Sequence, residues 1–200
     1  EMCIRDRYGI EALKAVWHRG AVDADGKTGD GAGIHVEIPK DFFIEKIEVT
    51  GHTHDSSDIC VGMIFLPRND YAAQESCKTI VESELTKNDF NIYGWRQVPV
   101  NPKVLGEKAF QTMPEIIQVL FKPHNKELTN KDLERKIYET RRKIENEAFK
   151  KSLNNFYICS LSSKSIIYKG MFLAEAISEF YLDLNDERFV SRYAIFHQRF

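Results

Sequence analysis

The sequence has no hydrophobic run long enough to cross a bilayer: its longer apolar stretches, such as residues 59–66, fall far short of the roughly 20 residues that a transmembrane helix needs. It also has no excess of charge of one sign. Its 28 basic and 30 acidic side chains give a net charge of −2, which provides no general attraction to nucleic acid or to an anionic membrane. No charged region followed by an apolar one marks a secretory signal. We therefore expect a cytoplasmic protein that binds neither nucleic acid nor membrane.

Cysteine is scarce and widely spaced. The four cysteines, Cys3, Cys60, Cys77 and Cys159, form no CxxC pair, so the sequence indicates neither a zinc site nor a redox dithiol. The last three lie in stretches with apolar periodicity, which predicts buried, unreactive thiols. This use of cysteine suits a reducing compartment.

The composition that remains is that of one globular domain, with 200 residues, 42% of them hydrophobic and 29% charged. Hydrophobic periodicity predicts helices over residues 10–17, 73–85, 131–151 and 172–181. It predicts strands over residues 34–38, 59–66, 90–100, 115–121, 156–162, 165–169 and 192–200. Strands and helices lack the regular alternation of a doubly wound sheet, and the pattern allows two sheets with helices outside them.

The segment 131–151 is the most highly charged of these elements, with eight basic and five acidic residues. Because the two signs are interleaved, the pattern favours a solvated helix face over an RNA-binding surface. Four apolar residues recur at helical spacing and are expected to face inward: Leu133, Ile137, Ile144 and Ala148.

Both ends of the chain differ from the rest. Residues 1–7 have no periodicity that continues into the helix after them, so we expect a head outside the domain, which then comprises residues 8–200. The last predicted strand runs to the final residue without a stop signal. We therefore expect the chain to be a fragment, incomplete at both ends.

The strongest local signal is His18-Arg19-Gly20-Ala21 followed by the glycine-rich segment 28–33. Closely spaced glycines permit positive φ and a close approach of backbones. No Gly-Lys-Ser/Thr follows, and the loop precedes a strand instead of joining a strand to a helix, so it is neither a Walker loop nor a dinucleotide fingerprint. The pattern alone favours a structural turn over a ligand loop.

Two arginines have alternative interpretations. Arg19 follows a helix end, where it either caps the helix carbonyls or binds a carboxylate, and the pattern favours the cap. Arg199 ends an apolar strand, where it either presents its guanidinium to a substrate carboxylate or lies on an exposed edge.

Other catalytic patterns are weak. His52 and His54, with Asp55 and Asp58, offer metal-ligand atoms, but no third partner is identifiable, so we predict no metal site. No Ser/His/Asp order and no Gly-x-Ser-x-Gly elbow is present.

Several segments, in order, resemble one family. The chain is similar to the amino-terminal glutaminase domain of the glutamate synthase large subunit, and the resemblance covers residues 8–200. The segments that carry it are Gly9–Leu13, His18–Ala21, Thr28–Ile34, Val61–Pro67, Gly94–Val100, Ser160–Ser163, Tyr168–Met171 and Phe196–Phe200. The resemblance implies an α/β (α+β) Ntn-hydrolase fold, a four-layer αββα sandwich. It also implies hydrolysis of the side-chain amide of L-glutamine to glutamate and ammonia.

The resemblance implies partners and cofactors only for the complete enzyme. In the family, ammonia travels to a synthase domain of the same chain, where it adds to 2-oxoglutarate and FMN reduces the product. An iron–sulfur cluster supplies the electrons, which come from a small flavin subunit or from ferredoxin. We expect these 200 residues themselves to hold neither FMN nor a cluster, and no metal.

The family mechanism also implies which site residues this chain contains. The nucleophile is a mature amino-terminal cysteine whose own α-amine, titrating near pH ~8, serves as general base. Cys3 is followed by Ile-Arg-Asp and does not match it, and the Asn-Gly pair that stabilises the oxyanion has no match either. The resemblance assigns substrate binding to Arg199, which would hold the α-carboxylate of glutamine, and to Arg19. It places Asp30 and Gly31 in the active-site loop, so we expect no catalytic residue in this chain and no activity from it alone.

Two alternatives remain open. One is a non-catalytic module that binds glutamine or assists assembly. The other is a different class-II amidotransferase, related to asparagine synthetase or amidophosphoribosyltransferase, which the long middle segment from Gly94 to Met171 disfavours.

Overall fold

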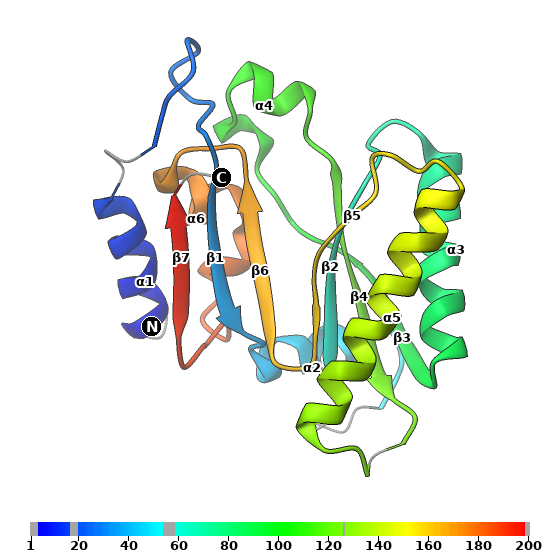
Figure 1. Ribbon diagram of the computed structural model, residues 1–200. Coiled ribbons are helices and arrows are strands. Elements are labelled where there is room, and N and C mark those ends of the chain that lie inside the picture. The colour runs from blue at the N-terminus through cyan, green and yellow to red at the C-terminus, as the bar shows by residue number, and fades with distance from the viewer. Residues whose placement is uncertain (1–3, 17–19, 54–58, 126, 199–200) are drawn as a thin grey trace. The chain divides into compact units, whose positions relative to one another are not determined.

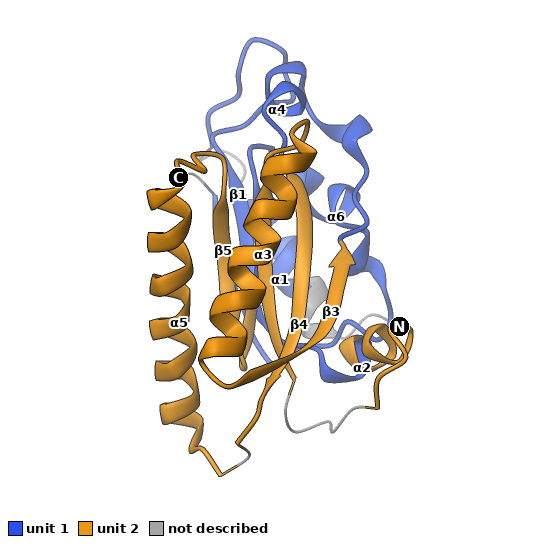
Figure 2. Cartoon of the chain, turned by 90° about the vertical axis from the view of Figure 1, so that its right-hand side faces the viewer, with its two compact units in different colours: residues 1–42, 98–113, 167–200 blue, residues 43–97, 114–166 orange. Residues whose placement is uncertain are grey.

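The computed structural model describes residues 4–16, 20–53, 59–125 and 127–198 (Figure 1). The chain forms two compact units, each built from segments that are distant in sequence (Figure 2). Unit 1 comprises residues 1–42, 98–113 and 167–200, and unit 2 comprises residues 43–97 and 114–166. The fold is α/β with two antiparallel sheets. This confirms the predicted class and is consistent with an Ntn-hydrolase fold.

Unit 2 contains a four-stranded antiparallel sheet in the order β3-β4-β2-β5. Its strands are β2 (Cys60–Leu66), β3 (Phe90–Gln97), β4 (Glu115–Pro123) and β5 (Tyr157–Ser162). Nearly every residue of β2 and β4 is buried, which explains why these strands read as continuous apolar runs. Pairing is irregular between Ile92 and Gly94, where Gly94 has φ +151, a conformation that suits glycine.

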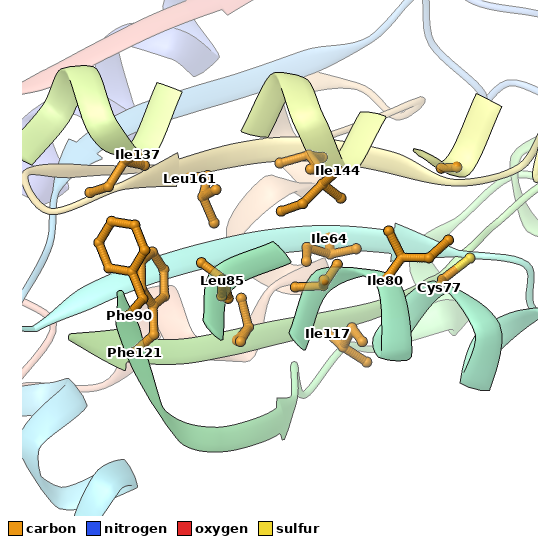
Figure 3. Close-up of a cluster of buried hydrophobic side chains, with 14 of the residues drawn as sticks. Ile64, Cys77, Ile80, Leu85, Phe90, Ile117, Phe121, Ile137, Ile144 and Leu161 are labelled. Carbon is orange, nitrogen blue, oxygen red and sulfur yellow. The ribbon is translucent and has the colours of Figure 1, made fainter. Parts of the chain in front are cut away.

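Helices α3 (Tyr71–Lys87) and α5 (Asn130–Lys150) contribute to one hydrophobic core with this sheet (Figure 3). Ile137 and Ile144 of α5 are buried, whereas ion pairs such as Arg135–Glu139 and Arg141–Glu145 lie along the helix. The amphipathic, solvated helix that the charge pattern predicted is confirmed.

Unit 1 contains a three-stranded sheet in the order β6-β1-β7. Its strands are β1 (Ala32–Glu37), β6 (Ser165–Gly170) and β7 (Ala194–Gln198). β1 and β7 are antiparallel, with Ala32 opposite Gln198 and Val36 opposite Ala194. Helix α1 (Ile4–Ala15) lies against β7 at Gly9, where an added Cβ would come within 2.6 Å of the Ala194 Cβ.

An aromatic cluster forms the core of unit 1. Its members are Phe42, Tyr168, Phe172, Phe180, Tyr181 and Phe189, whose neighbouring ring centroids lie 4.8–6.2 Å apart. The two buried hydroxyls find partners: Tyr168 donates to Asp183 Oδ2 at 3.0 Å, and Tyr181 donates to the Lys169 carbonyl at 2.8 Å. These bonds remove the penalty of burying the tyrosine hydroxyls.

The predicted helix over residues 172–181 is wrong. The structure has two 3-10 turns, η3 (Ala174–Ala176) and η4 (Leu182–Asn185), around the single-turn helix α6 (Ile177–Phe180). Backbone bonds to the segment 98–101 compete with a longer helix, because the Asn101 amide donates to the Phe180 carbonyl and the Leu182 amide donates to the Pro99 carbonyl.

Three further helices differ from the expectation. α1 begins at Ile4, so residues 4–7, assigned by the sequence to a non-domain head, are helical. α2 (Lys40–Glu48) and α4 (Glu107–Gln111) were not predicted, and η2 (Pro102–Val104) precedes α4. Such short helices depend on tertiary packing more than on periodicity, and the burial of Phe42, Phe43 and Ile47 on α2 illustrates this.

Candidate functional site

Two of the segments that carry the resemblance, His18–Ala21 and Thr28–Ile34, meet through backbone pairing in unit 1. The Ala21 amide donates to Asp30 Oδ2 at 3.3 Å, and the Asp30 amide donates to the Ala21 carbonyl at 3.2 Å. Val22 and Gly29 form an antiparallel bridge, which brings both sides of the loop together. The residues that follow His18-Arg19-Gly20 therefore lie beside those that lead into β1.

A third such segment, which contains Gln198, lies beside Gly20. Gly20 lies so close to the Gln198 side chain that an added Cβ would overlap the amide group of Gln198. Gln198 also lies opposite Ala32 in the β1–β7 register. Within unit 1 the structure thus assembles the chain neighbours of Arg19 and Arg199 next to the loop that contains Asp30.

The three alternating glycines of this loop serve different needs. At Gly29 an added Cβ would lie 2.8 Å from the Phe172 carbonyl oxygen, which is backbone and cannot rotate away. Gly31 has φ +119, which side-chain-bearing residues rarely adopt. At Gly33 an added Cβ would lie 2.5 Å from His197 Cε1 and 3.0 Å from Lys169 Cβ. The close approaches predicted from the glycines are therefore made to the protein's own chain.

Two histidines lie on the sheet beside this loop. Burial lowers the pKa of His35, and burial followed by the nearby Lys169 charge lowers the pKa of His197. Both imidazoles are therefore neutral near pH 7, and the Phe196-His197-Gln198 segment brings no positive charge of its own to the site.

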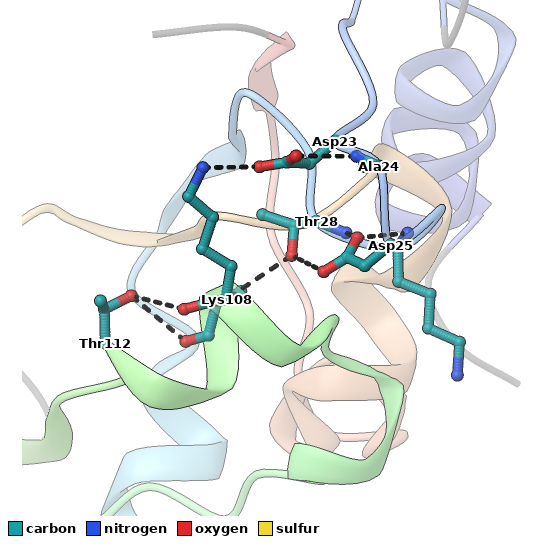
Figure 4. Close-up of polar contacts among 8 residues, drawn as sticks. Asp23, Ala24, Asp25, Thr28, Lys108 and Thr112 are labelled. Atoms are coloured by element: carbon teal, nitrogen blue, oxygen red, sulfur yellow. Dashed lines mark hydrogen bonds and ion pairs between the residues drawn. The ribbon is translucent and has the colours of Figure 1, made fainter.

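A hydrogen-bonded turn over residues 25–28 leads directly into the glycine-rich loop (Figure 4). Asp25 accepts hydrogen bonds from the amides of Lys27 and Thr28, at 2.9 and 2.7 Å, and from the Thr28 hydroxyl at 2.5 Å. These bonds, the hydroxyl first, lower the pKa of Asp25 to about 2. The Asp25 side chain is therefore a carboxylate at neutral pH.

The predicted site residues differ in how far the structure describes them. Asp30 and Gly31 lie in the loop as described, with Asp30 half-buried and Gly31 buried. Arg19 and Arg199 lie outside the described residues, so their roles stay predictions.

The residues considered as metal ligands, for which we predict no metal site, are only partly described by the structure. His54, Asp55 and Asp58 lie outside the described residues, and His52 is exposed, with Nδ1 3.0 Å from Thr50 Oγ1. Within the described residues, no group of three or more His, Cys, Asp or Glu side chains could hold a metal ion. The absence of FMN and of an iron–sulfur cluster from these 200 residues remains a prediction.

The prediction of buried thiols is confirmed for Cys60, Cys77 and Cys159. Burial raises the pKa of Cys77 to about 11, so its thiol is protonated at neutral pH. Among the helices that the structure describes, none is long and apolar enough to cross a membrane.

The sequence pattern included Thr28 in the glycine-rich segment 28–33, but it did not identify Asp25 or Gly106, where an added Cβ would overlap Asp25 and the Thr28 hydroxyl. Asp25-Gly26-Lys27-Thr28 does carry a signal, because an aspartate that binds the amides two and three residues onward forms an Asx-type turn. The partner helix α4 is distant in sequence, and no local pattern points to it.

Comparison with known proteins gives one consistent result. The family model of the class-II glutamine amidotransferases matches residues 6–200. The NADPH glutamate synthase large chain of Azospirillum brasilense is 56% identical over 192 residues, which is 96% of this chain and 13% of that protein. Ferredoxin-dependent glutamate synthases of Arabidopsis thaliana and Spinacia oleracea are 41% and 38% identical over 94% and 96% of this chain, each matched over 12% of its own length.

Proposed function

Because this chain belongs to the class-II glutamine amidotransferases, we propose that it forms part of a glutaminase domain that hydrolyses the side-chain amide of L-glutamine to glutamate and ammonia. It is homologous to the glutaminase part of glutamate synthase large chains. The observation that carries the proposal is the convergence of Gly20, Asp30 and Gln198 in unit 1. Three of the segments that carry the family resemblance meet there, and the one that contains Gln198 is distant in sequence from the other two.

The substrate role proposed for the two arginines follows from this convergence. Gly20 and Gln198, which contact each other, are the chain neighbours of Arg19 and Arg199. A guanidinium binds a carboxylate through two parallel hydrogen bonds, so an arginine suits the α-carboxylate of glutamine. Under the proposal Arg199 holds this group, Arg19 lines the same pocket, and the Asp30-Gly31 backbone borders it.

The setting of this domain is also part of the proposal. The chain spans about an eighth of the length of its curated relatives, so the activity of a whole glutamate synthase goes beyond the matched segment. We place it in a longer chain whose synthase domain takes up the ammonia, with FMN and an iron–sulfur cluster bound there and electrons supplied by a small flavin subunit or by ferredoxin. The buried thiols of Cys60, Cys77 and Cys159 support a reducing compartment such as the cytoplasm.

Arginine-to-lysine variants of the protein encoded by the complete reading frame test the proposal. Ammonia release from glutamine is measured for the wild type and for Arg199→Lys. Lysine keeps the charge but loses the two-pronged geometry, so KM for glutamine should rise by at least about tenfold with a smaller change in kcat. Arg192→Lys is the matched control, because Arg192 binds Glu37 at the surface. A wild type that releases no ammonia, or an Arg199→Lys variant with unchanged KM, contradicts the proposal.

We further propose that the 200-residue chain alone releases no ammonia. Cys60, Cys77 and Cys159 are buried and so are poorly accessible to glutamine, and burial also raises the pKa of Cys77, which makes its thiol a poor nucleophile. Incubation of the purified chain with glutamine and a coupled ammonia assay tests this. Ammonia production above that of a boiled sample would show that one of its own residues serves as nucleophile.

A further inference from the structure

We propose that Asp25 and Thr28 are positioning residues of the glutaminase: they fix the loop Gly29-Asp30-Gly31 against helix α4, and this fixed loop is needed for productive binding of glutamine. The inference rests on the proposed function and extends it to residues that do not touch the substrate. We call the group formed by Asp25, Thr28, Gly106 and Ala109 the loop clamp.

The first half of the clamp is the turn itself. The Asp25 carboxylate accepts three hydrogen bonds, two from the Lys27 and Thr28 amides and one from the Thr28 hydroxyl. Hydrogen bonds to an ionised group are about twice as strong as neutral ones, so this arrangement favours one conformation of the turn. Asp25 itself is exposed, yet the threonine it binds is 3% exposed.

The second half of the clamp is helix α4, which begins after Gly106. The Thr28 hydroxyl donates its one proton to Asp25, and its oxygen accepts the Ala109 amide at 3.4 Å. A Cβ at Gly106 would overlap Asp25 and the Thr28 hydroxyl, so only glycine permits this approach. The segment before α4 is in turn bound to the aromatic core through the bond from the Asn101 amide to the Phe180 carbonyl.

The clamp acts directly on the candidate site because Thr28 precedes the functional loop. The Thr28 carbonyl accepts the Asp23 amide at 2.8 Å, and the next residue, Gly29, pairs with Val22 and packs against the Phe172 carbonyl. Rotation of Thr28 would therefore move Gly29 and Asp30 together. Displacements of about 1 Å in a substrate-positioning element are enough to reduce rates by about a hundredfold.

A nearby ion pair provides the matched control. Lys108 Nζ lies 2.7 Å from Asp23 Oδ2, on the same loop and the same helix as the clamp (Figure 4). Both side chains are exposed, and exposed pairs contribute little to stability. Asp23→Asn thus removes the same charge from the same loop without touching the Thr28 hydroxyl.

The experiment uses the protein encoded by the complete reading frame, with the variants Asp25→Ala, Thr28→Val, Thr28→Ser and Asp23→Asn. Two quantities are measured for each: kcat and KM for glutamine hydrolysis, and the rate of tryptic cleavage after the exposed Lys27, followed by mass spectrometry. We expect Asp25→Ala and Thr28→Val to lower kcat/KM at least tenfold, mostly through KM, and to raise cleavage at Lys27. Thr28→Ser keeps the hydroxyl and should restore both values, and Asp23→Asn should match the wild type.

The outcomes separate this proposal from the one it rests on. Faster cleavage at Lys27 with unchanged kcat and KM would overturn the positioning role and leave the glutaminase function intact. Unchanged cleavage and unchanged kinetics would overturn the clamp altogether. A wild type that does not hydrolyse glutamine would overturn the proposed function, and this role with it. If Asp25→Ala fails to fold, the comparison of the isosteric Thr28→Val, which loses the hydroxyl, with Thr28→Ser, which keeps it, decides.

Discussion

Replacement of Gly29 by alanine tests whether the loop depends on a close backbone approach. The added Cβ would lie 2.8 Å from the Phe172 carbonyl oxygen and 2.9 Å from its carbonyl carbon. Both are backbone atoms of a segment held by the aromatic core, so the strain cannot be relieved by a side-chain rotation. Gly26→Ala is the matched control, since it adds the same methyl group to the same loop, where no atom lies within 4 Å.

The two substitutions are expected to destabilise the fold by different amounts. At Gly26 the only penalty is the backbone conformation, φ +70, which costs an alanine about 1 kcal/mol. At Gly29 the penalty is steric overlap, and overpacking of this kind typically costs about 1–3 kcal/mol. Because the obstructing atoms are backbone, we expect the upper end of this range. Gly29→Ala should therefore lower the free energy of unfolding by about 2 kcal/mol more than Gly26→Ala.

Urea denaturation followed by far-UV circular dichroism measures this difference. With an m-value of about 2 kcal/mol per molar urea, the midpoint for Gly29→Ala should lie about 1 M below that for Gly26→Ala. Equal midpoints would refute the reasoning, because they would mean that the loop moves away from Phe172 without resistance. Hydrogen exchange at the amides of β1, which follows the loop, would show the same ranking locally.

Three other predictions use matched comparisons or a defined pH range. Ile144→Ala removes a fully buried side chain and should destabilise the chain by about 2–5 kcal/mol in denaturant titration, whereas Phe149→Ala, at 83% exposure on the same helix, should stay within about 0.5 kcal/mol. Cys77, with its pKa raised from 9.0 to about 11, should react with iodoacetamide at pH 8 roughly a hundredfold more slowly than in the unfolded chain, and an equal rate would contradict the burial. The fold lowers the pKa of Asp25 from 3.8 to about 2, so the stability that its carboxylate contributes is present above pH 3.8 and is lost as the pH falls toward about 2. An NMR titration should show the Thr28 amide resonance shifting over this pH range in the wild type and not in Asp25→Ala.

Much of unit 2 could be predicted from the sequence because its elements have strong periodicity. The run of buried residues in β2 and the interleaved charges of α5 are local patterns, and each is typical of one kind of structure. The buried state of Cys77 followed from the same periodicity. The family resemblance added what no periodicity gives, namely the fold class and the expected chemistry.

The remainder depended on contacts between distant segments. The helix expected over residues 172–181 is broken because Asn101 and Leu182 bond across to another segment, and no local pattern reports this. The sequence likewise could not show why residue 29 must be glycine, because the backbone of Phe172 that it approaches is far away in sequence. The loop could be recognised as glycine-rich, but its support by α4 could not.

The pairing of β1 with β7 has a consequence for how the protein is made. These strands are separated by roughly 160 residues, so β1 leaves the ribosome long before its partner exists. At about 5–20 residues per second, β1 waits ~8–30 s for β7, and for most of that time both of its edges are unpaired, because its other neighbour, β6, is also synthesised late. During that time an unpaired strand edge is a template for aggregation, and a chaperone that shields it would act at this step. The site itself, which needs Gln198 beside Gly20, therefore assembles only after β7 has been synthesised.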